Sequence, residues 1–323
     1  MILNHVAVLG PGRIGRQIAL AFALGGCHVS LVDLKDRSAA EAAAVFADAR
    51  REVARDLRLM AEEGVISVGE VAPALARLED RRGLEGLDGC GFVQEALPEL
   101  VDLKRELLRR HAGRHAPKEL ALEVIIASTS STISPGHLVD FVRGGERFLV
   151  VHWLNPAHII PLVEVVPGRT TDAGVVERTI AMLEKLGKVP VRCADSPGFI
   201  GPRLQALLMN EAVRLVEEGV ATPEDVDRAF KAGMGFRYAT IGIFEFIDWG
   251  GVDILHRASE FLAKTLSEDR FRPARLVEEK IARNELGSKT GRGFFDYAGD
   301  RREAFETAKV RALLRQLRRQ RDA

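Results

Sequence analysis

The stretch HVAVLGPGRIG, residues 5–15, decides the fold. It begins with an apolar run typical of a buried strand, and residues 17–24 follow with a helical pattern. Between the two, Gly10 permits a tight turn, Gly12 lets the backbone approach a ligand, and Gly15 allows the helix to pack closely. The N-terminus of that helix points its free N–H groups at the ligand. The stretch therefore predicts a strand, a glycine turn and a helix that together bind a dinucleotide pyrophosphate.

A second predicted strand, residues 28–32, ends at Asp33, which follows the last glycine of the turn by eighteen residues. A carboxylate at this point accepts hydrogen bonds from the ribose 2′-hydroxyl of NAD and opposes the 2′-phosphate of NADP. We therefore expect NAD, although Lys35 and Arg37 leave some ambiguity. The alternative is a glycine-rich turn that binds nothing. The residues expected to hold the cofactor are Gly10, Gly12, Arg13, Ile14, Gly15, Asp33 and Glu95.

Strand and helix patterns alternate in the first part of the chain, which is typical of a parallel sheet covered by helices. After residue 195 no strand pattern recurs, and the remainder is helical, including a helix over 223–232 with Thr222 as N-cap. We predict an α/β fold with a Rossmann-type doubly wound, mostly parallel sheet over residues 1–194, followed by an all-α domain over 195–323. The predicted strands are 5–9, 28–32, 91–95, 122–127, 147–152, 161–166 and 188–192, and the predicted helices include 99–111, 172–186, 203–218 and an excursion of two helices, 38–63 and 69–78.

The composition excludes several classes of partner. Lys plus Arg and Asp plus Glu each number 46, so nucleic acid and acidic membrane surfaces are not expected to bind. Cys27, Cys90 and Cys193 lie far apart and show no metal-ligand spacing, so we expect no metal and a reducing, cytoplasmic setting. No signal-like segment or apolar run of transmembrane length occurs, so we expect a soluble protein with a small-molecule substrate.

A histidine stands at the end of a predicted strand, in the segment HWLNP, residues 152–156. Ligands of an open parallel sheet gather at this edge, and a neutral imidazole suits the removal of a hydroxyl proton during alcohol oxidation. Glu164 lies between apolar neighbours on the next strand and needs a partner; pairing with His152 would orient the ring and stabilise the imidazolium. Composition alone favours a structural histidine and a glutamate that is paired elsewhere.

The segment HWLNPAHIIPLVEVV, residues 152–166, resembles the HxxNP segment of the 3-hydroxyacyl-CoA dehydrogenase family. In that family this histidine and this glutamate form the catalytic dyad, so the resemblance assigns His152 and Glu164 to it. It also implies that Ser130 holds substrate, with Ser131 beside it, and that Asn155 contributes to substrate binding.

Other segments extend the resemblance over residues 3–297. The family implies NAD as cofactor, a homodimer built on the helical domain, and substrate between the two domains. The segments that carry this part of the resemblance are DSPGFI (195–200), FEFID (244–248) and GSKTGRGFF (287–295).

The sequence departs from the family at two places. Pro202 stands where family members carry an asparagine that hydrogen-bonds substrate, and proline has no side-chain donor. Asn210, two turns further on, matches a structural position better than a substitute for it. The turn over residues 235–242 is longer than usual and resembles the branch that includes lambda-crystallin and L-gulonate dehydrogenase, which implies a free hydroxy acid as substrate.

We therefore expect oxidation of a compact 3-hydroxy carboxylate, with Arg237 clamping its carboxylate through two parallel hydrogen bonds. One alternative is a short 3-hydroxyacyl-CoA, such as the 3-hydroxybutyryl-CoA of fatty acid metabolism; Arg237 would then pair at the dimer contact. The arginines of the helical excursion would then serve phosphates, or only solvent: Arg50, Arg51, Arg55 and Arg58. Another alternative is a non-catalytic, crystallin-like protein that binds NAD.

Overall fold

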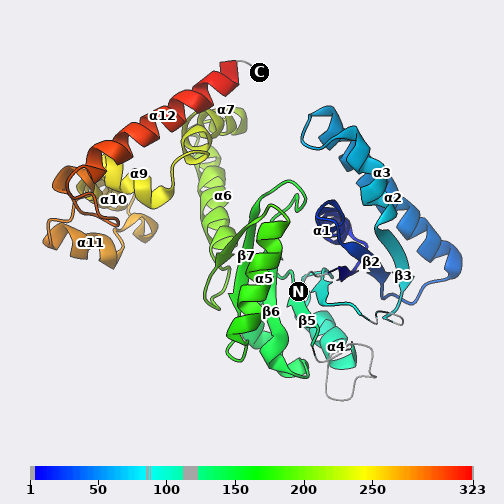
Figure 1. The fold of residues 1–323 in the computed structure, drawn as a ribbon. Coiled ribbons are helices and arrows are strands. Elements are labelled where there is room, and N and C mark those ends of the chain that lie inside the picture. Colours follow the sequence, from blue (N-terminus) through cyan, green and yellow to red (C-terminus); the bar gives the residue numbers. More distant parts are fainter. Residues whose placement is uncertain (1–3, 85–86, 88, 112–122, 322–323) are drawn as a thin grey trace. The chain divides into compact units, whose positions relative to one another are not determined.

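The computed structural model describes residues 4–84, 87, 89–111 and 123–321 (Figure 1). Contacts within the chain divide it into unit 1, Met1–Leu208, and unit 2, Met209–Ala323. This division lies inside helix α6, Gly201–Glu217. The domain boundary expected near residue 195 stays a prediction. Among the described helices, none combines the length and the apolar character that a bilayer span requires.

Unit 1 is built on one eight-stranded sheet with the order β3-β2-β1-β4-β5-β6-β7-β8. The mostly parallel sheet was expected, and among the described strands β6 and β7 form the one antiparallel pair. The chain builds outward from β1 in one direction and then from β4 in the other, so the strand order reverses between these two strands. The bounds are β1 His5–Leu9, β2 His28–Asp33, β3 Leu78–Arg82, β4 Phe92–Glu95, β5 Ile125–Ser128, β6 Phe148–Trp153, β7 Leu162–Pro167 and β8 Val189–Arg192.

Helices pack on both faces of this sheet. Side chains alternate across a strand, so Val6 and Val8 of β1 enter one buried cluster while Ala7 and Leu9 enter a second. The first cluster also takes residues from α1, α2, α3 and α5, and the second takes Leu107 and Leu108 from α4. The bounds are α1 Arg13–Leu24, α2 Ala39–Glu62, α3 Val68–Ala76, α4 Val101–His111 and α5 Ala173–Lys185.

The helical excursion ends earlier than expected. Helix α2 begins behind Ser38, whose side chain and that of Glu41 form a capping box, close to the expected start. The second helix stops at Ala76, and Leu78–Arg82 forms strand β3, which the sequence analysis missed. Because this strand pairs only with β2 at the edge of the sheet, it tolerates the charged sequence LEDRR. The predicted strand 122–127 is Ile125–Ser128, and Leu122 lies outside the described residues.

Unit 2 is helical, as expected, and is organised around one buried carboxylate. Asp248 accepts hydrogen bonds from the backbone N of Phe294 (2.9 Å) and Phe295 (2.8 Å) and from the Tyr297 hydroxyl (3.1 Å). A Cβ on Gly293 would lie 2.1 Å from its Oδ1, so the glycine is required. The two family-like segments, 244–248 and 287–295, therefore meet here. The helices of unit 2 after α6 are α7 Pro223–Ala229, a π-helical turn Phe230–Gly235, α8 Phe236–Tyr238, α9 Ile243–Gly250, α10 Val252–Thr265, α11 Arg275–Ala282 and α12 Arg301–Arg321.

Candidate active site

The sequence-predicted site residues of unit 1 gather along one edge of the sheet. Strands β1, β4, β5 and β6 are neighbours and run parallel, so their carboxyl ends meet at the same edge. In this order, Gly10 follows β1, Glu95 ends β4, Ser130 lies just after β5, and His152 lies one residue before the end of β6. The topology therefore brings the dinucleotide turn and the histidine segment to one side of unit 1.

The glycine turn has the geometry that the sequence predicted. Gly10 has φ +109°, and a Cβ there would lie 2.9 Å from the backbone oxygen of Ala96. A Cβ on Gly15 would lie 1.9 Å from the oxygen of Gly10, so α1 can pack against the turn only with glycine. A Cβ on Gly12 would meet nothing within 4 Å, which leaves open space at the helix N-terminus. Binding of the pyrophosphate by the first N–H groups of α1 stays a prediction.

A cavity of about 300 Å³ lies where the strand order reverses. Asp33 lies at this cavity and is 4% exposed; its carboxylate accepts from the backbone N of Lys35 (3.2 Å) and from Arg37 Nε (2.9 Å). The carboxylate is therefore held in place, but with a basic partner beside it. The cavity is lined by segments 10–12, 33–35 and 96–98 and by Arg37, Val45, Leu103, Glu106, Leu107 and Arg110.

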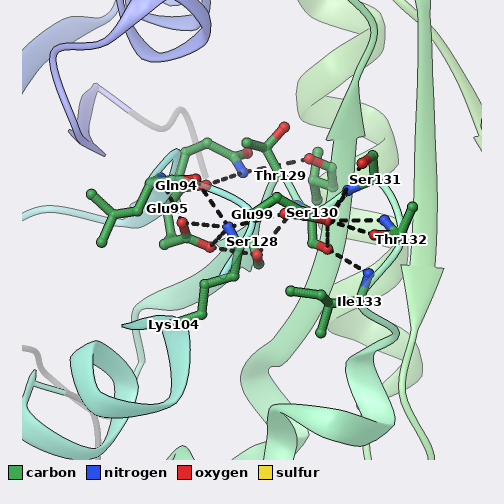
Figure 2. A network of polar contacts seen from close by, with 12 residues as sticks. Gln94, Glu95, Glu99, Lys104, Ser128, Thr129, Ser130, Ser131, Thr132 and Ile133 are labelled. Carbon is green, nitrogen blue, oxygen red and sulfur yellow. Dashed lines mark hydrogen bonds and ion pairs between the residues drawn. The ribbon is translucent and has the colours of Figure 1, made fainter. Parts of the chain in front are cut away.

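The remaining predicted cofactor residues differ in exposure. Arg13 is exposed at the start of α1, whereas Ile14 packs against the core. Glu95 is fully buried and does not line the cavity: Lys104 Nζ lies 2.7 and 2.9 Å from its two oxygens, and it accepts from Leu97 N (2.6 Å) (Figure 2). Ser128 donates to the same carboxylate. This network fixes the turn after β4, and a direct contact of Glu95 with the cofactor stays a prediction.

A second carboxylate organises the serine loop, and the sequence analysis missed it. Glu99 Oε1 accepts from Ser130 Oγ (2.5 Å), Ser131 N (2.9 Å) and Thr132 N (3.0 Å), as Figure 2 shows. Burial favours a higher pKa for Glu99, but these hydrogen bonds and the charge of Lys104 outweigh it and lower the pKa to about 2. Ser130 is fully buried and also accepts from Ile133 N (2.8 Å), so the hydrogen and one of the two lone pairs of its hydroxyl are used inside the loop.

The histidine and glutamate of the expected dyad face each other across two strands. In the antiparallel pair β6–β7, His152 lies directly opposite Glu164. His152 Nδ1 lies 2.7 Å from Glu164 Oε2, and the residues are 7% and 0% exposed. The one antiparallel pair of the sheet is therefore what brings these two side chains together.

Glu164 is also bound by the start of helix α6. Its Oε1 accepts from Ile200 N (2.9 Å) and Gly201 N (2.7 Å), where the helix N-terminus favours a negative charge. The two preceding residues, Gly198 (φ 74°) and Phe199 (φ 43°), are left-handed and turn the chain into this position. Burial favours a higher pKa for Glu164, but the hydrogen bonds from His152 and the two amides outweigh it and lower the pKa. Glu164 is therefore held as a carboxylate.

Three predicted substrate residues lie at different depths. Ser131 is half-buried in the serine loop, and Asn155 is exposed just after β6. Arg237 belongs to unit 2, where its guanidinium lies 4.0 Å from the ring centroid of Phe246. Pro202 is the second residue of α6, where the missing N–H leaves no helical hydrogen bond unmade. Contacts of these residues with substrate stay predictions.

The arginines of the helical excursion are mostly paired with carboxylates. Arg50 Nε lies 2.8 Å from Asp80 Oδ2, and Arg55 NH1 lies 2.8 Å from Glu52 Oε2. Arg51 pairs with Asp48. The positive charge of this helix face is therefore largely neutralised within unit 1.

Comparisons with known proteins agree with this architecture. Residues 5–196 match the 3-hydroxyacyl-CoA dehydrogenase, NAD binding domain, and residues 198–297 match the 3-hydroxyacyl-CoA dehydrogenase, C-terminal domain. The chain is similar to the 5-formyl-3-hydroxy-2-methylpyridine 4-carboxylate 5-dehydrogenase of Mesorhizobium japonicum, at 31% identity over 97% of each chain. It is also similar to a lambda-crystallin homolog of Bos taurus, at 37% identity over 74% of this chain and 72% of the relative.

Among solved structures, the 3-hydroxyacyl-CoA dehydrogenase of Archaeoglobus fulgidus has a TM-score of 0.73 and 31% identity, covering 97% of this chain and 98% of that one. The matched domains span both the glycine turn and the helical segments around Asp248. The chain therefore belongs to the 3-hydroxyacyl-CoA dehydrogenase family and is an NAD-dependent oxidoreductase that acts on a CH–OH group.

Proposed function

We propose that this enzyme oxidises the 3-hydroxyl of a compact 3-hydroxy carboxylate to a ketone, with His152 as general base. The observation that supports this most strongly is the buried contact of 2.7 Å between His152 Nδ1 and Glu164 Oε2. Because Nδ1 is bound to the carboxylate, Nε2 is the nitrogen that can take the hydroxyl proton. The resulting imidazolium gains the adjacent negative charge of Glu164 as a partner.

The glycine turn, Asp33 and the cavity beside them form the cofactor site in this proposal. The turn and the N-terminus of α1 hold the pyrophosphate, and Asp33 accepts from the ribose 2′-hydroxyl. When bound, the nicotinamide supplies the acceptor for the hydride of the alcohol carbon. Glu95 and Glu99 keep the neighbouring turns in place through Lys104 and the serine loop.

Two observations favour a free carboxylate as substrate over a coenzyme A thioester. Carboxylates already pair with Arg50, Arg51 and Arg55 on α2, so this face offers little free positive charge to phosphates. The Mesorhizobium relative is named for a pyridine carboxylate. We assign substrate contacts to Ser130, Ser131, Asn155 and Arg237. To donate to substrate, Ser130 would have to give up its hydrogen bond to Glu99.

The second candidate substrate is a short L-3-hydroxyacyl-CoA, such as 3-hydroxybutyryl-CoA in fatty acid metabolism. Its support is the name of the family and of the Archaeoglobus relative. This candidate needs positive charge on the arginine-bearing face of α2 to bind the phosphates of coenzyme A. Arg58, which is exposed there, carries the remaining charge of that face.

We further propose that the enzyme is a cytoplasmic homodimer, with unit 2 as the contact between copies. Helices of this unit carry apolar side chains at intervals of three, four, seven or eight residues, which place them on one helix face, and these stripes are exposed in the single chain. A second copy that covers them would bury them by symmetry. The stripes are Met209, Val213, Val216 and Val220 at the end of α6 and just beyond it; Ile254, Phe261 and Leu262 on α10; and Val310, Leu314 and Leu317 on α12.

The test is a panel of substrates, in which the absorbance of NADH measures the oxidation of each one. The proposal expects NADH from NAD with free 3-hydroxy acids, and a much lower kcat/KM with 3-hydroxybutyryl-CoA. Arg237→Lys should raise the KM of the acid, because a lysine cannot form two parallel hydrogen bonds to a carboxylate. Efficient oxidation of the thioester, with no NADH from any free acid, would replace the first candidate by the second.

A further inference from the structure

A buried lysine binds the loop that joins the two residues of the dyad. Lys188 is 8% exposed, and its Nζ donates to the backbone oxygens of Ala157 (2.7 Å), His158 (3.2 Å) and Ile160 (3.0 Å). All three carbonyls belong to residues 154–161, the connection from β6 to β7. An ammonium group has three N–H donors, so this loop takes all of them.

The ammonium group of Lys188 donates its hydrogen bonds to backbone carbonyls and not to a carboxylate. Its side-chain hydrogen bonds, within the described part of the chain, go to these three oxygens, and the centroid of the Trp153 ring lies 5.7 Å from Nζ. Burial, and then the charge of Lys188, favour a lower pKa for His158. Burial lowers the pKa of Lys188. Because a buried cation without a counter-charge is unfavourable, an apolar residue would serve plain packing better. The convergent carbonyls explain why a lysine stands here.

The backbone at Lys188 is fixed by the end of helix α5, and the next residue, Val189, donates its N–H to Pro161 O at the end of the loop (2.8 Å). Helix α5 ends in a Schellman motif: Gly187 (φ 72°) donates to Glu184 O (2.9 Å), and Lys188 N donates to Leu183 O (3.0 Å). Strand β8 then begins at Val189 and pairs with β7. The ammonium is therefore presented from a rigid support.

The loop is held from a second side by the cofactor helix. Ala157, which is fully buried, donates its N–H to Gln17 Oε1 (3.0 Å), and Gln17 lies on α1, just after the glycine turn. The loop begins two residues after His152 and ends three residues before Glu164. The position of this loop therefore affects where both His152 and Glu164 lie.

We propose that Lys188 is a positioning residue for this reaction: it gathers the carbonyls of residues 157, 158 and 160 and so holds His152 in register with Glu164 and with the cofactor helix. This inference rests on the proposed role of the dyad. A displacement of about 1 Å at a reacting group can lower the rate about 10²-fold, so loss of the ammonium group should slow the chemical step.

The experiment compares Lys188→Met with Lys185→Met, an exposed lysine that ends helix α5 three residues before Lys188. Lys188→Met should lower kcat by about 10-fold to 10²-fold with a smaller change in the KM for NAD. The acid limb of its kcat profile should move to lower pH, because a loosened Glu164 stabilises the imidazolium less. Amide hydrogen exchange over 154–161 should become faster. Lys185→Met should change none of these, and Lys188→Arg, which keeps a cation, should return the pH profile towards that of the wild type.

Lys188→Met with a wild-type pH profile and wild-type exchange would overturn the proposal, even if its Tm is lower, because only packing would then be lost. If that variant does not fold, Lys188→Gln carries the same predictions and the same contradicting result. Failure of the proposed function is seen separately, as full activity in His152→Ala. If His152→Ala keeps full activity, amide hydrogen exchange over residues 154–161 still decides whether Lys188 holds the loop.

Discussion

In unit 1, the sheet and its helices bury two large apolar clusters, and Phe22 of α1 is 0% exposed. In unit 2, Phe261 of α10 is 67% exposed, and α10 buries only Val252. The buried group that ties the segments of unit 2 together is polar, namely the carboxylate of Asp248 with its three donors.

This difference separates the tasks of the two units. The dense packing of unit 1 fixes backbone amides and carbonyls around a few buried charged groups, which is what a proton-transfer site needs. In unit 2, apolar side chains of α6, α10 and α12 are exposed in the single chain, which supports the proposed role of these helices in association.

The largest effect is expected in unit 1, from His152→Ala. Loss of the general base should lower kcat by about 10²- to 10⁴-fold, while the dissociation constant of NAD changes little, because the glycine turn is untouched. Steady-state kinetics and NAD titration measure both. His28→Ala, an exposed histidine of β2, is the control and should keep full activity. Wild-type turnover by a folded His152→Ala variant would show that this histidine is structural and is not the general base.

In unit 2 the largest effect is expected from Asp248→Ala. It leaves two backbone N–H groups and the Tyr297 hydroxyl without their acceptor, so the free energy of unfolding should fall by about 3 kcal/mol. Trp249 fluorescence in a Trp153→Phe background reports the unfolding of this unit. The control is Asp253→Ala, which removes a more exposed ion pair with Lys289 and should cost about 0–1 kcal/mol. Equal losses in both variants would contradict the central place of Asp248.

A third prediction concerns the exposed stripe of α10. If a second copy covers it, Phe261→Glu should weaken self-association by about 30-fold or more, measured by sedimentation across a concentration series. The matched control is Lys264→Glu, a charged residue of the same helix. A monomeric wild-type enzyme with full activity would show that unit 2 needs no partner.

The smallest effect is expected from Glu99→Gln. The pKa of Glu99 is lowered from 4.5 to about 2, so the carboxylate stabilises the fold above about pH 4.5 and loses this effect as the pH falls towards 2. Glu99→Gln should therefore flatten the dependence of the urea midpoint on pH in this window, measured through Trp153 fluorescence in a Trp249→Phe background. An unchanged slope would mean that Glu99 does not hold the serine loop.

Much of unit 1 could be predicted because its signals are local. The strand ending at Asp33 and the helix that begins near Ser38 follow from neighbouring residues, and the structure has both within a residue. The helix after the glycine turn was expected over 17–24 and begins four residues earlier, at Arg13. Strand β3 could not be found, because its sequence LEDRR lacks an apolar pattern and it depends on pairing with β2.

Other features depend on contacts between distant segments. Glu99 binds residues 31 to 33 positions later, and Lys188 binds carbonyls 28 to 31 positions earlier, so no spacing rule reveals either. The amides of Ile200 and Gly201 are equally invisible as partners of Glu164, because backbone donors leave no mark in the residue types. For His152 and Glu164, the resemblance supplied the pairing that composition alone did not favour.

The most direct test of the central claim is the pH dependence of kcat/KM in the wild type and in Glu164→Gln. If His152 takes the proton and Glu164 stabilises its charged form, the wild-type rate falls on the acid side with a single inflection, and the neutral amide moves this inflection to lower pH while lowering the plateau. Identical acid limbs in the two proteins would contradict the claim, because the buried contact of 2.7 Å would then have no part in the proton transfer.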